Sequence, residues 1–243
     1  MEKGRTALVT GGSRGIGAAV VRLLASRGVR TACTYFRSPG PARALALEFP
    51  GLVEPIAYEL GSLDSAERAA DEAVARLGHL DTVVANAGVW AGGPLTRIDM
   101  DTWSRVLNEN VVGTAQLCRA VLPALRAADG DRSITIVSSA VAMIGGVGDS
   151  AYSSAKLALL GLSRTVAQES GRYGIRVNAV APGIVETDMT ASLPDGAVAA
   201  VVDGLLLRRA GTVEEIAAAI SFLALDATYC TGATLTVDGG WSV

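Results

Sequence analysis

The sequence is poor in the residues that hold metals and disulfides. It has three cysteines, Cys33, Cys118 and Cys230, and a single histidine, His79. The cysteines are few and too widely spaced for a metal-ligand pattern, which is typical of a protein from a reducing compartment. His79 lies in a predicted turn between a helix and a strand, where we expect it to be solvated. We therefore predict no metal site and no catalysis that depends on histidine.

Long apolar runs and blocks of like charge are also missing. Half of the 243 residues are hydrophobic, but Gly, Pro or charge breaks each run before the roughly 20 residues that a membrane span needs. The net charge of −3 is mixed along the chain, which argues against nucleic acid and anionic membranes as partners. Residues 1–5 lead directly into a strand-like segment without a signal-peptide core. We therefore expect a cytoplasmic protein.

Strand and helix patterns alternate along the whole chain. Strands are predicted at residues 6–10, 31–35, 52–58, 82–85, 133–137, 176–180 and 234–237. Helices are predicted at 16–26, after the turn at 38–41, and at 65–77, about 100–127, 152–171 and 214–225. No linker divides the pattern, so residues 1–243 are predicted to form one α/β domain, a parallel sheet with helices on both faces. The cofactor site is expected in its N-terminal half and the catalytic and substrate elements in its C-terminal half.

The turn after the first predicted strand is rich in glycine. Residues 10–17 read TGGSRGIG, a Gly-x-x-x-Gly-x-Gly spacing. Glycines let a backbone approach a pyrophosphate closely, and the N-terminus of the following helix favours its negative charge. The alternative is a tight strand-to-helix turn without a ligand. Its position in a β-α-β unit favours a dinucleotide site.

The end of the second predicted strand bears on the choice of cofactor. Folds that bind NAD usually place an acidic residue there, on the ribose hydroxyl. Residues 34–38 read TYFRS and contain no acid. Arg37, and Arg14 in the glycine turn, could instead meet a 2′-phosphate, which a carboxylate would repel. NADP(H) is therefore favoured over NAD(H), unless both arginines are only solvated surface charges.

Tyr152 and Lys156 are one helical turn apart, with Ser139 upstream. Residues at i and i+4 share one face of a helix. A free tyrosine has a pKa of about 10 and is a poor acid or base at neutral pH. A nearby ammonium favours the phenolate and lowers that pKa, so the pair is interpreted as a proton-transfer device.

Together these motifs resemble the short-chain dehydrogenase/reductase family over essentially the whole chain, and within it the 3-oxoacyl-acyl-carrier-protein reductases. The resemblance implies a Rossmann fold, carbonyl reduction or alcohol oxidation with NAD(P), and the following site residues. The implied catalytic residues are Asn110, Ser139, Tyr152 and Lys156. The implied cofactor-binding residues are Gly11, Ser13, Arg14, Gly15, Ile16, Gly17, Arg37, Glu59, Leu60, Asn86, Ala87, Gly88, Tyr152, Lys156, Pro182, Gly183, Ile184 and Thr187.

The family assigns each catalytic residue a role. Tyr152 is the general acid in reduction, Lys156 lowers its pKa and binds the nicotinamide ribose, Ser139 donates to the substrate oxygen, and Asn110 holds a relay water. Glu59 departs from the family, which often has an aspartate at this point. Each residue also has a structural alternative: a strand end for Ser139, a buried helix amide for Asn110 and a core position for Tyr152.

Two functions follow as expectations. The first is an NADPH-dependent reductase of a small-molecule ketone, with a 3-oxoacyl thioester among the candidates. The alternative is a catalytically silent NADP(H)-binding sensor or scaffold on the same fold. The helix after Tyr152 is apolar nearly all round at residues 157–162, so one face needs a partner other than the sheet. Together with the resemblance, this predicts a homotetramer.

Overall fold

The computed structural model describes residues 4–191 and 196–243, so the first three residues of the predicted N-terminal segment lie outside it. The described strands form one parallel sheet in the order β3-β2-β1-β4-β5-β6-β7. The strands are β1 (Thr6–Val9), β2 (Arg30–Tyr35), β3 (Val53–Ala57), β4 (Thr82–Ala85), β5 (Arg132–Val137), β6 (Ile175–Pro182) and β7 (Thr234–Val237). The predicted fold class, a doubly wound parallel sheet, is confirmed.

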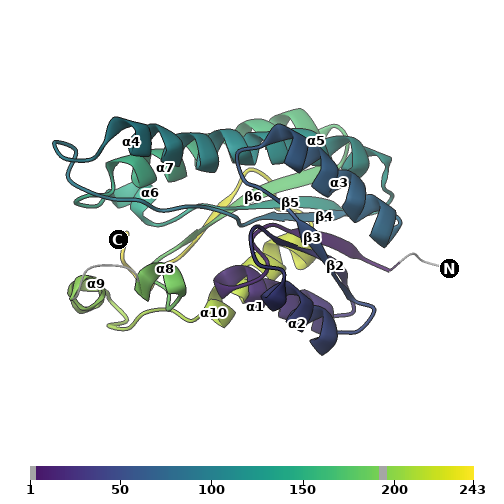
Figure 1. Ribbon diagram of the computed structural model, residues 1–243, viewed down its shortest axis with the longest axis horizontal. Coiled ribbons are helices and arrows are strands. Elements are labelled where there is room, and N and C mark those ends of the chain that lie inside the picture. Colours follow the sequence, from purple (N-terminus) through teal and green to yellow (C-terminus); the bar gives the residue numbers. More distant parts are fainter. Residues whose placement is uncertain (1–3, 192–195) are drawn as a thin grey trace.

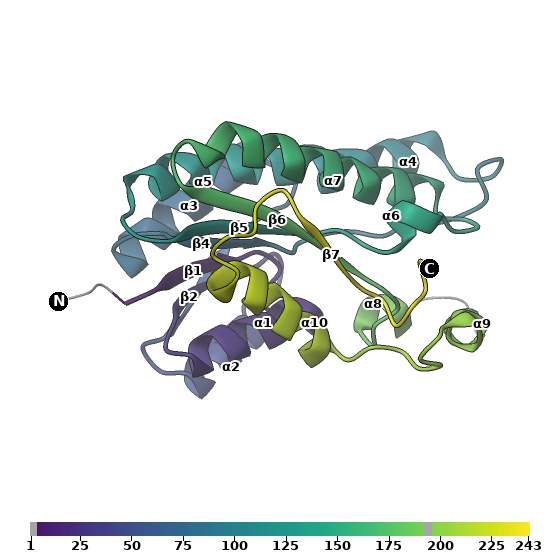
Figure 2. The same cartoon turned by 180° about the vertical axis from the view of Figure 1, so that it is seen from behind.

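Helices cover both faces of this sheet. One face carries α3 (Leu63–Leu77), α4 (Met100–Leu107), α5 (Gly113–Ala127), α6 (Val141–Ile144) and α7 (Ser150–Gly171). The other face carries α1 (Gly15–Ser26), α2 (Gly40–Glu48) and α10 (Val213–Ser221). Two short helices, α8 (Asp188–Ala191) and α9 (Ala197–Gly204), lie at the end of the sheet where α4 and α6 also lie (Figures 1 and 2).

The sheet separates two hydrophobic cores, because neighbouring residues of a strand point to opposite faces. Leu8 pairs in register with Ala32 of β2 and Val83 of β4, and this row packs against α3, α5 and α7. The next row belongs to the core beneath α1, α2 and α10, and consists of Val9, Cys33 and Val84. Central strands buried on both faces explain why the strands appear in the sequence as short continuous apolar runs.

The helix predicted over residues 100–127 is interrupted. A π-helical turn, η1 (Asn108–Val112), separates α4 from α5 and contains Asn110. Thr114 donates its hydroxyl to the Asn110 carbonyl at 2.6 Å, which satisfies a backbone group inside the turn. A second π-helical turn, η2 (Phe222–Asp226), ends α10. Such turns are frequent at functional sites because they change the direction of one side chain without ending the helix.

The single histidine is partly buried, two of the three cysteines are buried, and none of these three residues lines the cavity. The His79 side chain is only 20% exposed and its Nε2 lies 3.3 Å from Asp81 Oδ2, so the expectation of a solvated histidine is wrong. Cys33 and Cys118 are buried, and burial raises the pKa of each thiol to about 12. Neither thiol is therefore a reactive thiolate. Across the described ranges, no helix combines the length and apolar character needed to cross a bilayer.

Strand order reverses between β1 and β4, since β2 and β3 extend the sheet on one side and β5 to β7 extend it on the other. In open α/β sheets, ligands bind in the crevice outside the carboxyl ends of the strands at such a point. The loops that follow β1, β2, β4, β5 and β6 all contribute residues to a single large cavity there.

Candidate functional site

The glycine turn after β1 has the shape that a phosphate group requires. Gly11 and Gly15 have φ angles of +62° and +53°, a region that favours glycine. A Cβ on Gly17 would lie 2.2 Å from the carbonyl oxygen of Gly11, so the turn can pass close to α1 only with glycine there. Arg14 precedes α1 and makes no side-chain cap, which leaves backbone N–H groups of the first turn available to an anion.

Asn86, just after β4, fixes the glycine turn in place. Its Nδ2 donates to the carbonyl of Thr10 at 3.0 Å and to that of Gly11 at 3.3 Å. The Thr10 hydroxyl in turn accepts from the backbone N–H groups of Asn86 and Ala87, each at 3.1 Å. The loops after β1 and β4 are thus a single hydrogen-bonded unit across the point where the sheet reverses.

The arginines predicted to meet a 2′-phosphate both line the cavity beside the end of β2. The Arg37 guanidinium lies 5.2 Å from the centre of the Phe36 ring. Within the described part of the chain neither Arg14 nor Arg37 pairs with a carboxylate, so both charges are available. Glu59 and Leu60 line the same end of the cavity after β3. The two guanidinium groups of Arg14 and Arg37 can donate hydrogen bonds to a phosphate, so this end of the cavity fits the 2′-phosphate of a dinucleotide.

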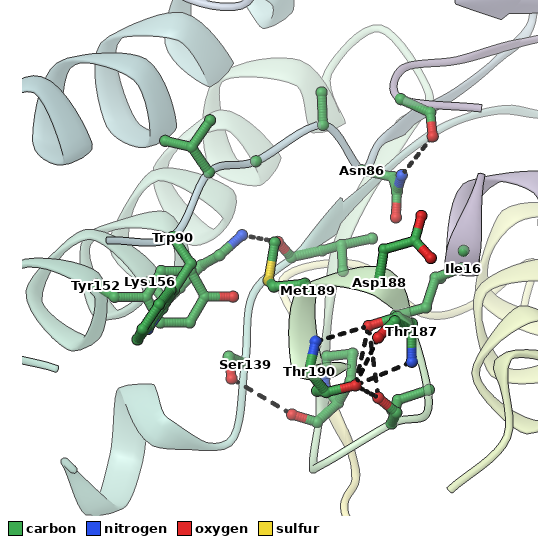
Figure 3. Close-up of a pocket in the computed structure, with 18 of the residues that line it drawn as sticks. Ile16, Asn86, Trp90, Ser139, Tyr152, Lys156, Thr187, Asp188, Met189 and Thr190 are labelled. Carbon is green, nitrogen blue, oxygen red and sulfur yellow. Dashed lines mark hydrogen bonds between the residues drawn. The ribbon is translucent and has the colours of Figure 1, made fainter. Parts of the chain in front are cut away.

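Ser139, Tyr152 and Lys156 come from two elements and face the same space (Figure 3). Ser139 follows β5, and its hydroxyl lies 3.5 Å from the carbonyl oxygen of Pro182. Lys156 is 3% exposed, and its Nζ donates to the carbonyl of Val137 at 3.0 Å. The helix is held against the strand by Ser138, whose hydroxyl donates to the Lys156 carbonyl at 2.7 Å.

The expectation that Lys156 lowers the pKa of Tyr152 is not met in this geometry. Burial raises the pKa of Tyr152, the nearby charge of Asp149 raises it further, and a hydrogen bond with Ser139 opposes the rise. Burial also lowers the pKa of Lys156 to about 8. Lys156 Nζ lies 5.5 Å from the centre of the Tyr152 ring, over its face. The i, i+4 spacing places the two residues together, but desolvation dominates both ionisations.

Asn110 lies behind the cavity wall and does not line it. It is fully buried in η1, where its Nδ2 donates to the carbonyls of Val89 and Val106, each at 2.9 Å. A Cβ on Gly88 would lie 2.9 Å from Asn110 Oδ1 and 3.1 Å from Lys156 Nζ. The glycine at position 88 therefore leaves space in which the asparagine and the lysine are near neighbours.

The segment after β6 closes the opposite wall of the cavity. Pro182, Gly183, Ile184 and Thr187 all line it. Gly183 also permits close packing, because a Cβ there would lie 2.6 Å from the Cα of Asp238. Thr187 is held by Thr190, whose hydroxyl accepts from the Thr187 N–H at 2.9 Å. The same cavity wall therefore contains backbone from β6 and the start of α8.

The cavity has a volume of about 1110 Å³ and brings together nearly every predicted site residue. Gly17 and Asn110 lie outside its lining, the first packed against Gly11 and the second behind Gly88. Trp90, Asp149 and Met189 also line it and are not among the site residues named from the sequence, although residues 141–150 and 185–206 were expected to form the substrate pocket. Their positions offered a signal, because Trp90 follows the Asn86-Ala87-Gly88 motif and Asp149 precedes the Tyr152 helix.

Comparison with known proteins gives consistent matches. A family model described as enoyl-(acyl carrier protein) reductase matches residues 11–242. The 3-oxoacyl-[acyl-carrier-protein] reductase FabG of Escherichia coli is 37% identical over 239 residues, covering 98% of this chain and 97% of that protein.

Solved structures agree over the whole fold. A short-chain dehydrogenase from Burkholderia cenocepacia in complex with NADP has a TM-score of 0.92 and 32% identity. A blue fluorescent protein from a metagenomic library in complex with NADPH has a TM-score of 0.89 and 36% identity. Each match covers 99% of both chains.

Proposed function

The chain belongs to the short-chain dehydrogenase/reductase family and is an NAD(P)-dependent oxidoreductase, and on this basis we propose that it uses NADPH to reduce a ketone to a secondary alcohol. One observation carries the proposal: Tyr152, Ser139 and Lys156 share a cavity with the glycine turn after β1. A proton donor and a dinucleotide site therefore face the same substrate volume.

The proposed roles follow from where each group lies. When bound, the reduced nicotinamide supplies the hydride that the carbonyl carbon receives. Tyr152 donates its hydroxyl proton to the carbonyl oxygen, and Ser139 donates a hydrogen bond that orients that oxygen. Lys156, whose pKa is lowered by burial to about 8, can exchange a proton near neutral pH and so return one to Tyr152. Asn110 holds the Val89 backbone beside the lysine.

The residues that would hold the cofactor divide into three groups. The glycine turn and the first turn of α1 would take the pyrophosphate. Arg14 and Arg37 would take a 2′-phosphate, with Glu59 and Leu60 beside the adenine. Asn86 to Gly88 and the segment from Pro182 to Thr187 would line the remaining length.

Replacing the positive charge of Arg37 by a negative one should weaken the binding of NADPH and leave the binding of NADH nearly unchanged. We expect Arg37→Asp to raise the Kd for NADPH by roughly 10- to 100-fold, because a charge-assisted contact becomes a repulsion. The Kd for NADH should change little, as measured by fluorescence titration. Arg43→Asp is the control, since Arg43 is exposed on α2 and does not line the cavity. Equal binding of both nucleotides by the unsubstituted protein would contradict the preference.

We also propose a homotetramer. The outer face of α7 exposes Leu157, which is 54% exposed, and on the other side of the sheet Phe222, at the start of η2, and Tyr229, just after η2, are also exposed. Two separate apolar surfaces are what two different two-fold contacts need. Light scattering at micromolar concentration should give four times the chain mass, and Leu157→Glu should give a smaller assembly. A stable monomer would rule out the proposal.

Ketone reduction itself is tested with a panel of cyclic ketones and acetoacetyl thioesters, followed by loss of NADPH absorbance. Turnover of at least one ketone is the expected result. Tight NADPH binding without turnover of any panel member would instead favour the silent sensor or scaffold. The intact set of Asn110, Ser139, Tyr152 and Lys156 argues for the enzyme, because nucleotide binding alone does not require a proton donor.

A further inference from the structure

Trp90 is a part of the substrate side of the cavity that the ketone reductase chemistry does not use. The residue before it, Val89, is tied to Asn110 through both its N–H, at 3.3 Å, and its carbonyl, at 2.9 Å. Trp90 then lies beside Tyr152 (Figure 3). Its indole Nε1 donates to Asp149 Oδ1 at 2.7 Å. Trp90 is thus held through the backbone of the preceding residue, Val89, and through its own ring nitrogen.

The two loops that carry Trp90 and Asp149 are joined a second time. The N–H of Gly93 donates to the carbonyl of Gly148 at 2.8 Å. A Cβ on Gly92 would lie 2.6 Å from Trp90 Cζ2, so the indole packs directly on the loop backbone. Asp149 immediately precedes α7, and its carbonyl accepts from the Ser153 N–H at 2.7 Å. Asp149 is therefore fixed one helical turn before Tyr152, and Trp90 is held beside Asp149 by the loop after β4.

Asp149 has acceptor capacity that the protein itself does not use, and within the described residues its negative charge is met only by the N-terminal end of α7. Only Oδ1 accepts the indole N–H, and no group in residues 4–191 or 196–243 donates to Oδ2. A Cβ on Gly146 would lie 2.7 Å from Oδ2, so glycine at 146 leaves that oxygen uncovered. No arginine, lysine or histidine of the described chain forms an ion pair with Asp149, and Lys156 Nζ is directed to Val137.

This negative charge opposes the proposed reaction unless something compensates for it. The charge of Asp149 adds to the burial that raises the pKa of Tyr152, and a tyrosine with a higher pKa is a weaker acid. A neutral asparagine or glutamine could accept the same indole hydrogen bond. The N-terminus of α7 favours a carboxylate here, and a positive charge that binds on the cavity side would compensate for its effect on Tyr152.

We propose that Trp90 and Asp149 form a subsite for a cationic group, so that the preferred substrate is a ketone bearing an ammonium near its carbonyl. The inference rests on the proposed ketone reduction. The carboxylate supplies the opposite charge, and the indole face attracts cations through its quadrupole. The lining of the cavity also contains the apolar side chains of Val89 and Val141. Asp188, another carboxylate of the cavity lining, lies beside Ile16 on the cofactor side (Figure 3).

Two ketones of matched shape isolate the effect of charge. In 1,1-dimethyl-4-oxopiperidinium a quaternary nitrogen replaces the quaternary carbon of 4,4-dimethylcyclohexanone. The quantity measured is the ratio of kcat/KM for the cation to that for the neutral ketone. We expect Asp149→Asn to lower this ratio on the order of 10- to 100-fold. Comparing ratios between variants cancels the difference in intrinsic reactivity between the two ketones.

Controls separate a cation subsite from a structural role. Asp71→Asn removes the same charge from the exposed side of α3, outside the cavity lining, and should leave the ratio unchanged. Trp90→Phe keeps an aromatic face and should retain part of the preference. A loss of activity in Asp149→Asn that is equal for both ketones would make the carboxylate only a structural acceptor and overturn the proposal. So would an Asp149-dependent preference for 4-hydroxycyclohexanone without one for the cation.

Calorimetry makes the test independent of turnover. The cation is titrated into the complex of the protein with NADP⁺, with and without Asp149→Asn. Binding that weakens in the variant supports the subsite, and if neither these ketones nor any member of the panel is reduced, the proposed ketone reduction fails while the subsite stands. Equal binding by both proteins overturns the subsite, and reduction of the neutral ketone would then leave ketone reduction intact.

Discussion

Tyr152→Phe should lower kcat by roughly 10²–10⁴-fold, the usual contribution of a general acid. The substitution removes one hydroxyl and keeps the ring, so the packing of α7 on the sheet is unchanged. The lost group is the one that hydrogen-bonds with Ser139. The affinity for NADPH should barely change, because the glycine turn and the two arginines are untouched. Steady-state turnover of a reducible ketone and a separate nucleotide titration measure the two quantities.

The matched control for this variant is Tyr173→Phe. Tyr173 follows the other end of α7, where its hydroxyl accepts from Arg172 at 2.7 Å. The Tyr173→Phe variant loses the same hydroxyl oxygen at a position outside the cavity lining, so its turnover should remain close to that of the unsubstituted protein. Near-normal turnover in Tyr152→Phe would remove Tyr152 from the mechanism.

Arg176→Met should destabilise the fold by about 3–5 kcal/mol, the cost of removing one partner from a buried ion pair. The Arg176 side chain is 8% exposed and contacts Asp131 through Nε at 2.8 Å and Nη2 at 2.9 Å. It also donates to carbonyls of the π-helical turn η2 and the residue after it, at 2.6, 2.9 and 3.1 Å. Methionine fills much of the volume but leaves these carbonyls without their donor and leaves Arg5 as the remaining partner of the carboxylate.

Denaturant unfolding at fixed protein concentration measures this loss, since assembly adds to the apparent stability. Arg68→Met is the control, because Arg68 is exposed on α3. A loss in Arg176→Met no larger than in the control would mean that the buried network contributes little.

The effect of Arg176→Met should also depend on pH. Burial favours the neutral form of Asp131, but hydrogen bonds and charge from Arg176 and Arg5 outweigh it and hold the pKa of the carboxyl below its usual range. A lowered folded-state pKa stabilises the fold above the unfolded-state value of about 3.9, and this stability is lost as pH falls through the lower folded value. The difference between the two proteins should therefore narrow between pH 7 and pH 3. A difference that stays constant with pH would assign the loss to the orphaned carbonyls alone.

Local pattern was sufficient for much of the fold and for the grouping of the proposed site. The apolar runs predicted the parallel strands because those strands are buried on both faces. The glycine spacing at residues 11–17 predicted a turn whose backbone leaves no room for a side chain at Gly12 or Gly17. The ends of parallel strands meet at one edge of the sheet, so motifs that follow successive strands had to lie close together. That is why Asn86, Ser139 and Pro182 line one cavity.

The sequence by itself determined the α/β alternation, the glycine turn and the i, i+4 placement of Tyr152 and Lys156, because each depends on contacts within a few residues. Only the tertiary structure decided the π-helical turn at Asn110, the burial that raises the pKa of Tyr152, and the bond between Trp90 and Asp149. These depend on desolvation and on pairing between loops that are distant in sequence. The spacing of residues along the chain does not reveal the desolvation of a side chain or the pairing of distant loops, because the path of the backbone around the sheet sets both.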